Sequence, residues 1–382
     1  MNPKGKPLPR ALSFRELTVW KTDLPDVKFG VLPPSNNRPN PLATHEMLYA
    51  SVFAPGAICA LDRDNGKLLW RKKLSKYGNA SAYFHDERLF AGSPNTLFAL
   101  RPDSGETIWS FCPYGNEGES IYSSPTVHED RLYIGDRRGW LHCLDAASGK
   151  AIWKSRTNRT RNGDVNSTPV VMHGLAMVST NARTAVAYDA LSGKLAWKQQ
   201  LDGPSIFGPL VHEDSVLAIS NSLYVLNSRT GRVRRRLSWG ELKVEQGDST
   251  QQSIVLMFSP KLSHTKLPSG KAEAEKIAAR ESETGRMVFI AKSGMQRTKS
   301  VGVFCPCFRY APATRLVYLS HLHGVDVFRP PTGTLLFRLQ VENDTHGGVA
   351  SVDVREEKIY VLTGDGCLYA LRHPTALESL DS

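Results

Sequence analysis

Short apolar runs recur along the chain, and each is followed by a turn and then by a tryptophan. Residues 58–61 lead through Asp62 and Gly66 to Trp70. Equivalent runs lie at 97–100, 141–144 and 186–188, and they lead to Trp109, Trp153 and Trp197. Runs this short, bounded by turn-forming residues, predict β-strands. Because an Asp side chain can accept backbone N–H groups and Gly adopts a positive φ, each unit predicts a strand–turn–strand hairpin.

The glycines of these turns repeat at nearly regular intervals. They stand at positions 66, 105, 149, 193, 231, 285 and 333. Spacings of about 40 residues with several strands each are typical of propeller blades. The pattern therefore predicts an all-β fold, an eight-bladed β-propeller of four-stranded antiparallel blades. The predicted blades span residues 28–75, 79–113, 121–157, 166–201, 206–239, 241–292, 300–340, and 347–372 with 14–21.

The two ends of the chain are predicted to complete one blade between them. Residues 17–24 look like a fourth strand with its Trp20, yet no third strand precedes them. Residues 358–371 supply second and third strands with no fourth strand after them. We therefore expect an N-terminal strand at 14–21 to pair into the last blade and to close the ring. The expected domains are a loose N-terminal tail at 1–13, a single propeller at 14–372 and a C-terminal tail at 373–382.

The repeat resembles the pyrroloquinoline-quinone (PQQ) type propeller repeat, whose signature is Ala-x-Asp-x-x-Thr-Gly-x-x-x-Trp. The matching residues are Ala60, Asp62, Gly66 and Trp70, and again Ala187, Asp189, Gly193 and Trp197. The resemblance implies that the tryptophan docks between neighbouring blades. Proteins with this repeat include the quinoprotein alcohol dehydrogenases and the propeller lipoprotein of the bacterial outer-membrane barrel-assembly machinery, to which this chain is similar in size.

Composition and cysteine usage bear on the compartment. Hydrophobic residues make up 41% of the chain and charged residues 22%, which indicates a globular protein. No apolar segment approaches the roughly 18 residues of a membrane span. Residues 1–10 carry charge without a following apolar run, unlike a secretory signal. The six cysteines are scattered, as is typical of buried free thiols in a reducing compartment. These signals predict a cytoplasmic protein.

The formal net charge of +11 allows an anionic partner such as nucleic acid, an acidic membrane surface or an acidic protein. Much of this charge falls on predicted fourth strands, as in Arg71, Lys154, Lys198 and Arg234. Fourth strands are the outer edges of blades, where charge blocks pairing between edges. We therefore favour edge protection over nucleic-acid binding.

The predicted site lies on one face of the propeller, which we call the loop face. It holds the loops between second and third strands and the crossovers between blades. The candidate ligand-binding residues are Tyr122, Arg137, Arg138, Asn166, Arg183, His321, His323 and His346. Arginines gathered there suit a carboxylate, a phosphate or an acidic peptide. His321 and His323 share one side of an extended segment, but no spacing supports a third metal ligand, so no metal is expected.

Three functions remain open. The first is a non-catalytic, monomeric scaffold, without a cofactor, that binds a protein or a small anionic ligand on the loop face. The second, implied by the resemblance, is a PQQ-dependent dehydrogenase with calcium; those enzymes carry adjacent cysteines, and this chain has no Cys-Cys pair. The third is a basic nucleic-acid-binding propeller, whose affinity would fall steeply with salt. Catalytic residues are not identified.

Overall fold

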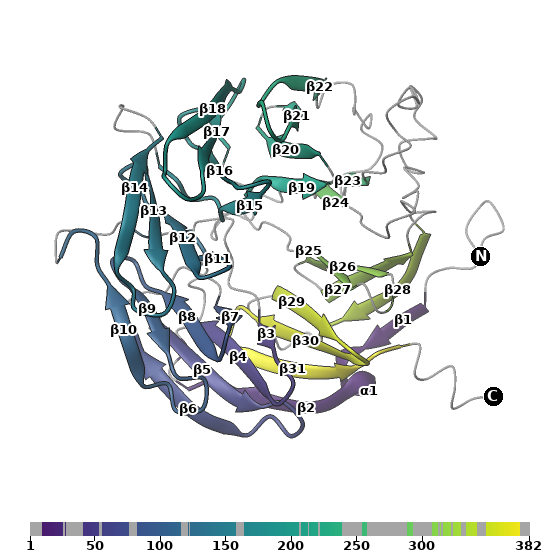
Figure 1. Ribbon diagram of the computed structural model, residues 1–382. Helices are drawn as coiled ribbons and strands as arrows, with labels where there is room; N and C mark the ends of the chain where they lie inside the picture. The colour runs from purple at the N-terminus through teal and green to yellow at the C-terminus, as the bar shows by residue number, and fades with distance from the viewer. Residues whose placement is uncertain are drawn as a thin grey trace, which may run out of the picture.

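The computed structural model describes residues 10–25, 27, 41–52, 56–75, 82–115, 121, 123–157, 164–205, 208–212, 214–220, 222–238, 254–257, 289–292, 308–311, 314, 316–321, 324–329, 334–341 and 349–374. These residues form eight sheets: six with four strands, one with five and one with two. Figure 1 shows the sheets side by side around a common centre. The prediction of an all-β fold of four-stranded antiparallel sheets is confirmed, and the arrangement is consistent with a β-propeller.

The strands of the first five sheets follow one another along the chain. Sheet one contains β3 (Leu42–Ala43), β4 (Met47–Val52), β5 (Ala57–Asp62) and β6 (Leu68–Lys73). Sheet two contains β7 (Tyr83–His85), β8 (Arg88–Gly92), β9 (Leu97–Leu100) and β10 (Thr107–Phe111). Sheet three contains β11 (Thr126–His128), β12 (Arg131–Gly135), β13 (Trp140–Asp145) and β14 (Ala151–Arg156). Sheet four contains β15 (Val170–Met172), β16 (Leu175–Thr180), β17 (Thr184–Asp189) and β18 (Leu195–Gln200). Sheet five contains β19 (Leu210–His212), β20 (Ser215–Ile219), β21 (Ser222–Asn227) and β22 (Val233–Ser238).

The last three sheets bring the two ends of the chain together. Sheet six pairs β23 (Ile254–Met257) with β24 (Phe289–Lys292), and the turn expected at Gly285 lies outside the described residues. Sheet seven contains β25 (Phe308–Ala311), β26 (Leu316–His321), β27 (Gly324–Arg329) and β28 (Thr334–Gln340), with β1 (Arg10–Ser13) parallel to β28. Sheet eight contains β29 (Val349–Arg355), β30 (Lys358–Thr363) and β31 (Cys367–Arg372), with β2 (Thr18–Asp23) antiparallel to β31. Figure 1 shows the purple N-terminal strands beside β28 and β31.

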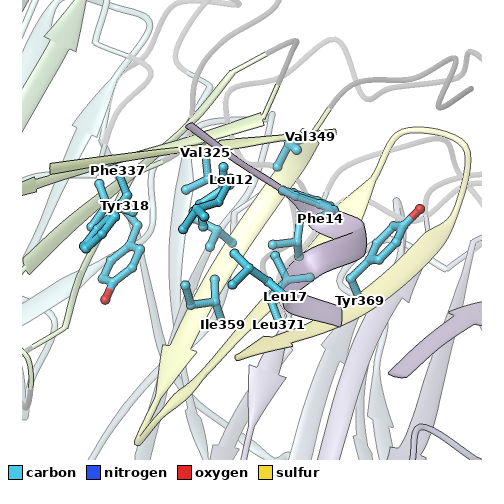
Figure 2. Packing of buried hydrophobic residues seen from close by; sticks show 14 of the residues in the cluster. Leu12, Phe14, Leu17, Tyr318, Val325, Phe337, Val349, Ile359, Tyr369 and Leu371 are labelled. Atoms are coloured by element: carbon cyan, nitrogen blue, oxygen red, sulfur yellow. The ribbon is translucent and has the colours of Figure 1, made fainter. Parts of the chain in front are cut away.

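The expected N-terminal tail ends earlier than predicted, because residues 10–13 form β1 instead of a loose segment. A short helix, α1 (Phe14–Leu17), follows, and Ser13 and Glu16 form a capping box at its start. Leu12, Phe14 and Leu17 are buried between sheets seven and eight, against residues such as Tyr369 (Figure 2). The C-terminal boundary shifts as well: His373 is buried and shares a hydrogen bond with the Tyr318 hydroxyl. Both ends of the chain therefore hold these two sheets together.

The hydrophobic core lies between sheets, in layers that join each sheet to the next. One layer joins sheets two and three, and includes Phe90, Trp109, Leu132 and Leu144. Similar layers join sheet seven to eight, eight to one, one to two, three to four and four to five. Because sheets one to four and sheet eight are covered on both faces by these layers, their inner strands are almost wholly apolar.

Every described fourth strand of the seven larger sheets contains a β-bulge at the same position. In sheet three, Cys143 pairs with Trp153 but Leu144 pairs with Ala151, so Ile152 has no cross-strand partner. The same register shift occurs in sheets one, two, four, five, seven and eight. A bulge bends and twists an edge strand. It directs the next side chain, usually tryptophan, toward the following sheet.

Each of these tryptophans lies on the turn glycine of the next sheet, as the resemblance implied. A Cβ atom at Gly66 would lie 2.4 Å from the Trp20 ring, and one at Gly105 would lie 2.7 Å from the Trp70 ring. The indole Nε1 of Trp20 also donates to the carbonyl of Arg63, at 3.1 Å. Trp109, Trp153 and Trp197 repeat this arrangement on Gly149, Gly193 and Gly231. A glycine is required there because the side chain of any other residue would meet the indole.

The junction between sheets eight and one has further contacts besides Trp20. Arg63 forms an ion pair with Glu356 at 3.1 Å, and Lys358 forms one with Asp64 at 2.8 Å. The Arg355 guanidinium donates to the carbonyl of Ala43 at 2.9 Å. The N-terminal strand β2 therefore lies in a sheet that is tied to sheet one by packing, by hydrogen bonds and by charge.

Candidate functional site

The turn between β12 and β13 is organised by one buried carboxylate on the loop face. Asp136 is fully buried, and its Oδ1 accepts the backbone N–H groups of Arg138 at 2.8 Å and Trp140 at 3.0 Å. A side chain that accepts N–H groups two and four residues on fixes the path of a turn. Asp136 therefore fixes the backbone positions from which the Arg138 and Trp140 side chains extend.

The other oxygen of Asp136 joins sheet three to the segment that follows sheet two. The Tyr114 hydroxyl donates to Oδ2 at 2.7 Å, and His142 Nε2 lies 2.8 Å from the same oxygen. Burial raises the pKa of Tyr114, and so does its hydrogen bond to Asp136. The phenol consequently stays neutral and remains a donor. The His142 ring also packs edge-on against Phe111, with centroids 5.4 Å apart.

Cations and aromatic rings meet above this buried group. The Arg138 guanidinium carbon lies 3.9 Å from the centroid of the Tyr114 ring. Lys154 Nζ and the Arg156 guanidinium carbon lie 5.0 and 5.6 Å from the Trp140 ring. These separations are within the range of cation–π attraction. We call Tyr114, Arg138, Trp140, Lys154 and Arg156 the cation–aromatic cluster.

The strand register explains why the cluster forms. Trp140 is directly opposite Arg156, and His142 is directly opposite Lys154. Residues two apart on a strand share a face, so all four side chains lie on the face of sheet three that looks toward sheet two. Tyr114 comes from the end of sheet two and meets them there.

The structure places several predicted site residues on the loop face. Arg137 and Arg138 lie on the β12–β13 turn, and Arg137 Nε is 3.6 Å from Asp164 Oδ2. Arg183 is exposed in the β16–β17 turn, with a φ of +62°. Asn166 is half-buried in the crossover between sheets three and four. Only Arg138 of these residues belongs to the cation–aromatic cluster.

The other predicted residues are not placed. Tyr122, His323 and His346 lie outside the described residues, and His321 is described only as the last residue of β26. Within the described ranges, no group of three His, Cys, Asp or Glu side chains is arranged to hold a metal ion. The expectation that no metal binds remains a prediction.

Sequence reasoning missed Tyr114, Asp136 and His142, although one signal was available. Asp136 follows Gly135 and precedes Gly139, which is a turn signature that also predicts an Asp side chain bonded to the turn. The contact of Tyr114 with Asp136 crosses from one sheet to the next, and no local pattern indicates it.

Comparison with known proteins found a matching family model and several similar proteins. The family model described as outer membrane protein assembly factor BamB matches residues 16–171, 93–255 and 137–302, which together cover more than half of the chain. An outer membrane protein assembly factor BamB from Legionella pneumophila (strain Paris) is 28% identical over 105 residues, covering 28% of this chain and 26% of that protein. One from Francisella salina is 32% identical over 106 residues, covering 26% of this chain and 19% of that protein. The matched segments thus span about a quarter or less of these curated relatives.

Solved structures support the fold alone. The computationally designed Ika8 protein aligns with a TM-score of 0.63 at 11% identity, covering 93% of this chain and 99% of that chain. Quinohemoprotein alcohol dehydrogenase ADHIIG from Pseudomonas putida HK5 aligns with a TM-score of 0.62 at 13% identity, covering 93% and 76%.

The expectation of a cytoplasmic protein is wrong. The relatives from Legionella and Francisella are outer membrane protein assembly factors. The thiols of Cys59, Cys112, Cys143 and Cys367 are free, but buried free thiols reflect packing and do not fix the compartment. No helix among the described residues has the length and apolarity needed to cross a membrane.

Proposed function

The chain belongs to the family of outer membrane protein assembly factor BamB, and from that membership we propose that it is a non-catalytic propeller scaffold. Its loop face would bind a protein partner during outer membrane protein assembly. The observation that supports this role most strongly is the repeated docking of tryptophan on glycine between sheets, which makes a rigid frame under variable loops.

We propose further that the propeller is a single, monomeric domain of eight blades. Sheet six would complete the ring between sheets five and seven, and β2 would close it as the fourth strand of the eighth blade. The pairing of β2 with β31 supports closure, and so does the docking of Trp20 on Gly66 of sheet one. A closed ring leaves no sheet face open to other chains.

The two faces of the scaffold differ in the side chains that a partner could contact. The face with the short turns is shaped by stereotyped hairpins, in which Asp145 and Asp189 bond their own turn backbones. The loop face holds the cation–aromatic cluster together with Arg137 and Arg183. Arginine, tryptophan and tyrosine are the residues that most often dominate protein interfaces. A protein partner is therefore favoured over a small anionic ligand.

Neither alternative function has a specific observation in its favour. The likeness to quinohemoprotein alcohol dehydrogenase is a likeness of fold at 13% identity, and the chain has no adjacent cysteines. Some fourth-strand cations that could serve a nucleic-acid site are engaged within the fold, as in the ion pairs of Arg338 with Asp326 at 2.9 Å and of Arg236 with Asp202 at 2.7 Å.

Crosslinking in native cells, followed by purification of the tagged chain and mass spectrometry, tests the proposed role. We expect a component of outer membrane protein assembly to be captured, and the purified pair to re-form a complex. A chain that captures no such component, or that reduces a dye when given an alcohol with PQQ and calcium, would contradict the proposal.

A further inference from the structure

We propose that the outer edge of β10 in sheet two is a docking site for an extended, uncharged segment of a partner protein, which pairs with β10 as an additional strand. The site lies on the edge of a sheet and not on the loop face, so the inference goes beyond the proposed function. It rests on three observations: a strand that the chain already adds to an equivalent edge, the absence of charge from β10, and the exposure of β10.

The first observation is that the outer edge of a sheet in this chain can accept another strand. In sheet seven, β1 lies parallel to the fourth strand, and its residues Arg10–Ser13 are opposite Phe337–Gln340. The pairing begins at Phe337, the residue directly after the β-bulge, which we call the docking position because tryptophan holds it in most other sheets. The bulge that all these fourth strands share therefore does not prevent the addition of a strand.

The side chains of this pair show what kind of segment an edge accepts. Ala11 is exposed and lies opposite Arg338, whereas Leu12 is buried and lies opposite Leu339. The guanidinium of Arg338 donates to both carboxylate oxygens of Asp326, at 2.9 and 3.3 Å. The one charge on this part of the edge is thus neutralised within sheet seven. The added segment supplies a small residue and then an apolar residue that becomes buried.

The second observation concerns the residue directly after the docking position, which distinguishes sheet two from the other larger sheets. In the other six it is a cation: Lys21, Arg71, Lys154, Lys198, Arg236 and Arg338. In β10 it is Ser110, and no residue of Thr107–Phe111 is charged. Charged side chains on an edge strand oppose pairing with a further strand. The sequence of β10 lacks this protection.

The third observation is that β10 is accessible from outside the molecule. It is the outermost strand of sheet two in the part of the chain that the structure describes (Figure 1). Ile108 is 45% exposed, Ser110 is exposed and Phe111 is half-buried. Phe111 stands two residues after the docking position, as Leu339 does in sheet seven. An apolar residue added opposite Phe111 would cover its ring, just as Leu12 covers Leu339.

These features define the chemistry of the partner segment. Pairing at a sheet edge uses backbone N–H and C=O groups, which give affinity, while side chains at alternate positions give specificity. The segment therefore needs a small residue opposite Ser110 and an apolar residue opposite Phe111. A nucleic acid is held mainly by cations, and β10 itself carries none. An extended stretch of protein is the ligand that this edge fits.

Fluorescence anisotropy with the full chain tests the proposal. The probe is a labelled peptide of about eight residues in which Leu alternates with Ser and Thr. Its matched control has the same side chains but carries N-methyl groups on the central backbone amides, which removes hydrogen bonds to an edge. We expect the probe to bind with a dissociation constant below about 1 mM. The N-methylated peptide should bind at least about tenfold more weakly, because several backbone hydrogen bonds are lost.

Ser110→Lys is the decisive variant, because it gives β10 the charge that the other larger sheets carry at this position. The fold should tolerate it, and peptide binding should weaken at least about tenfold. Gln200→Lys is the matched control: it adds the same charge at an exposed residue of β18 in sheet four, and should leave binding within about twofold. Thermal unfolding of both variants separates lost binding from lost fold.

Amide hydrogen exchange of the peptide complex locates the bound strand, and protection should increase on β10 but not on β14 or β18. The proposal is wrong if the probe does not bind, if both peptides or both variants bind equally, or if protection increases on another strand. The crosslinking experiment is independent of this assay. Capture of an assembly component without binding of the peptide would leave the scaffold role and remove this site, and the opposite pair of results would do the reverse.

Discussion

The Trp153 ring of sheet three lies directly on Gly193 of sheet four. A Cβ atom at Gly193 would be 2.6 Å from Cδ2 of the ring, and the indole Nε1 donates to the carbonyl of Ala190 at 3.1 Å. Ser155, two residues after the tryptophan, donates to the carbonyl of Gly193 at 2.5 Å. A ring face and two hydrogen bonds thus fix the position of one sheet on the next.

The two glycines of sheet four allow a matched test of this contact. Gly193 and Gly174 have nearly equal φ values, +70° and +71°, but only Gly193 has a ring against it. Gly174→Ala should therefore cost only the left-handed backbone penalty, about 1–2 kcal/mol of unfolding free energy. Gly193→Ala should cost that penalty and a further 1–3 kcal/mol of overpacking. Urea unfolding of both variants measures the difference. Equal losses would contradict the contact, because they would show that the Trp153 ring can move away from the new methyl group with no loss of unfolding free energy.

Truncating a docked tryptophan should lower the unfolding free energy about as much as replacing the turn glycine beneath it with alanine. Trp197 is 7% exposed, and its Nε1 donates to the carbonyl of Ser228 at 2.8 Å. Trp197→Ala should lower the unfolding free energy by about 3–5 kcal/mol, as large-to-small changes in packed cores do. Trp140→Ala is the comparison, since Trp140 is half-buried and not docked on a glycine, and it should cost clearly less. A loss below about 1 kcal/mol for Trp197→Ala would contradict the docking account.

The sequence predicted the parts of the fold that are encoded locally. The Asp, Gly and Trp of each repeat give the turn, the positive φ and the docking ring. Trp20, together with the missing fourth strand after residues 358–371, predicted that β2 joins the last sheet. The parallel pairing of β1 with β28 was not predicted, because four residues beside a Pro- and Lys-rich stretch show no strand pattern. The Ser13–Glu16 capping box was the one local sign of α1.

The site was predicted in part, for the same reason. Arg137 and Arg138 were recognisable as loop-face residues once the repeat fixed where the loops fall. The acid of the turn, Asp136, lies two residues before Arg138, but the ring stacked on Arg138 comes from another segment, because Tyr114 follows β10 of sheet two. Such contacts depend on how two sheets are stacked, which periodicity along one chain does not specify.

The N-terminal segment should contribute stability through its buried face alone. Phe14, which lies beside Tyr369 in Figure 2, is 2% exposed, and the two ring centroids are 5.4 Å apart. Val19 on the next strand is 44% exposed. Phe14→Ala should lower the unfolding free energy by about 3–5 kcal/mol. Val19→Ala should change it by no more than about 0.5 kcal/mol. Thermal and urea unfolding check both values. Similar, small effects would mean that residues 10–17 do not brace sheets seven and eight.

Part of the loss of unfolding free energy at acidic pH should come from protonation of Asp202. Burial raises the pKa of this carboxyl, but hydrogen bonds from Ser220, Ser222 and Arg236 outweigh burial and lower the pKa from 3.8 to about 2. A carboxyl whose pKa is lowered in the folded state stabilises the fold above its unfolded pKa, and that contribution is lost as pH falls from about 4 to 2. The size of the shift corresponds to roughly 2 kcal/mol.

Asp202→Asn should therefore lower the unfolding free energy at pH 7 by roughly 2 kcal/mol, with the difference from the unaltered chain shrinking as pH falls below about 4. Asp86→Asn, at an exposed carboxylate paired only with its neighbour Arg88 in the described contacts, should change it by less than about 0.5 kcal/mol. Denaturant unfolding between neutral and acidic pH gives both curves. A pH-independent difference for Asp202→Asn would rule out this linkage.

A double-mutant cycle on Trp153 and Gly193 tests most directly whether each sheet is held to the next by an indole on a glycine. If the ring rests on the glycine, Gly193→Ala in the Trp153→Ala background should cost only the backbone penalty of about 1–2 kcal/mol, clearly less than in the unaltered chain. The predicted result is a coupling of at least about 1 kcal/mol between the two changes. Losses that add to within about 0.5 kcal/mol would contradict the account.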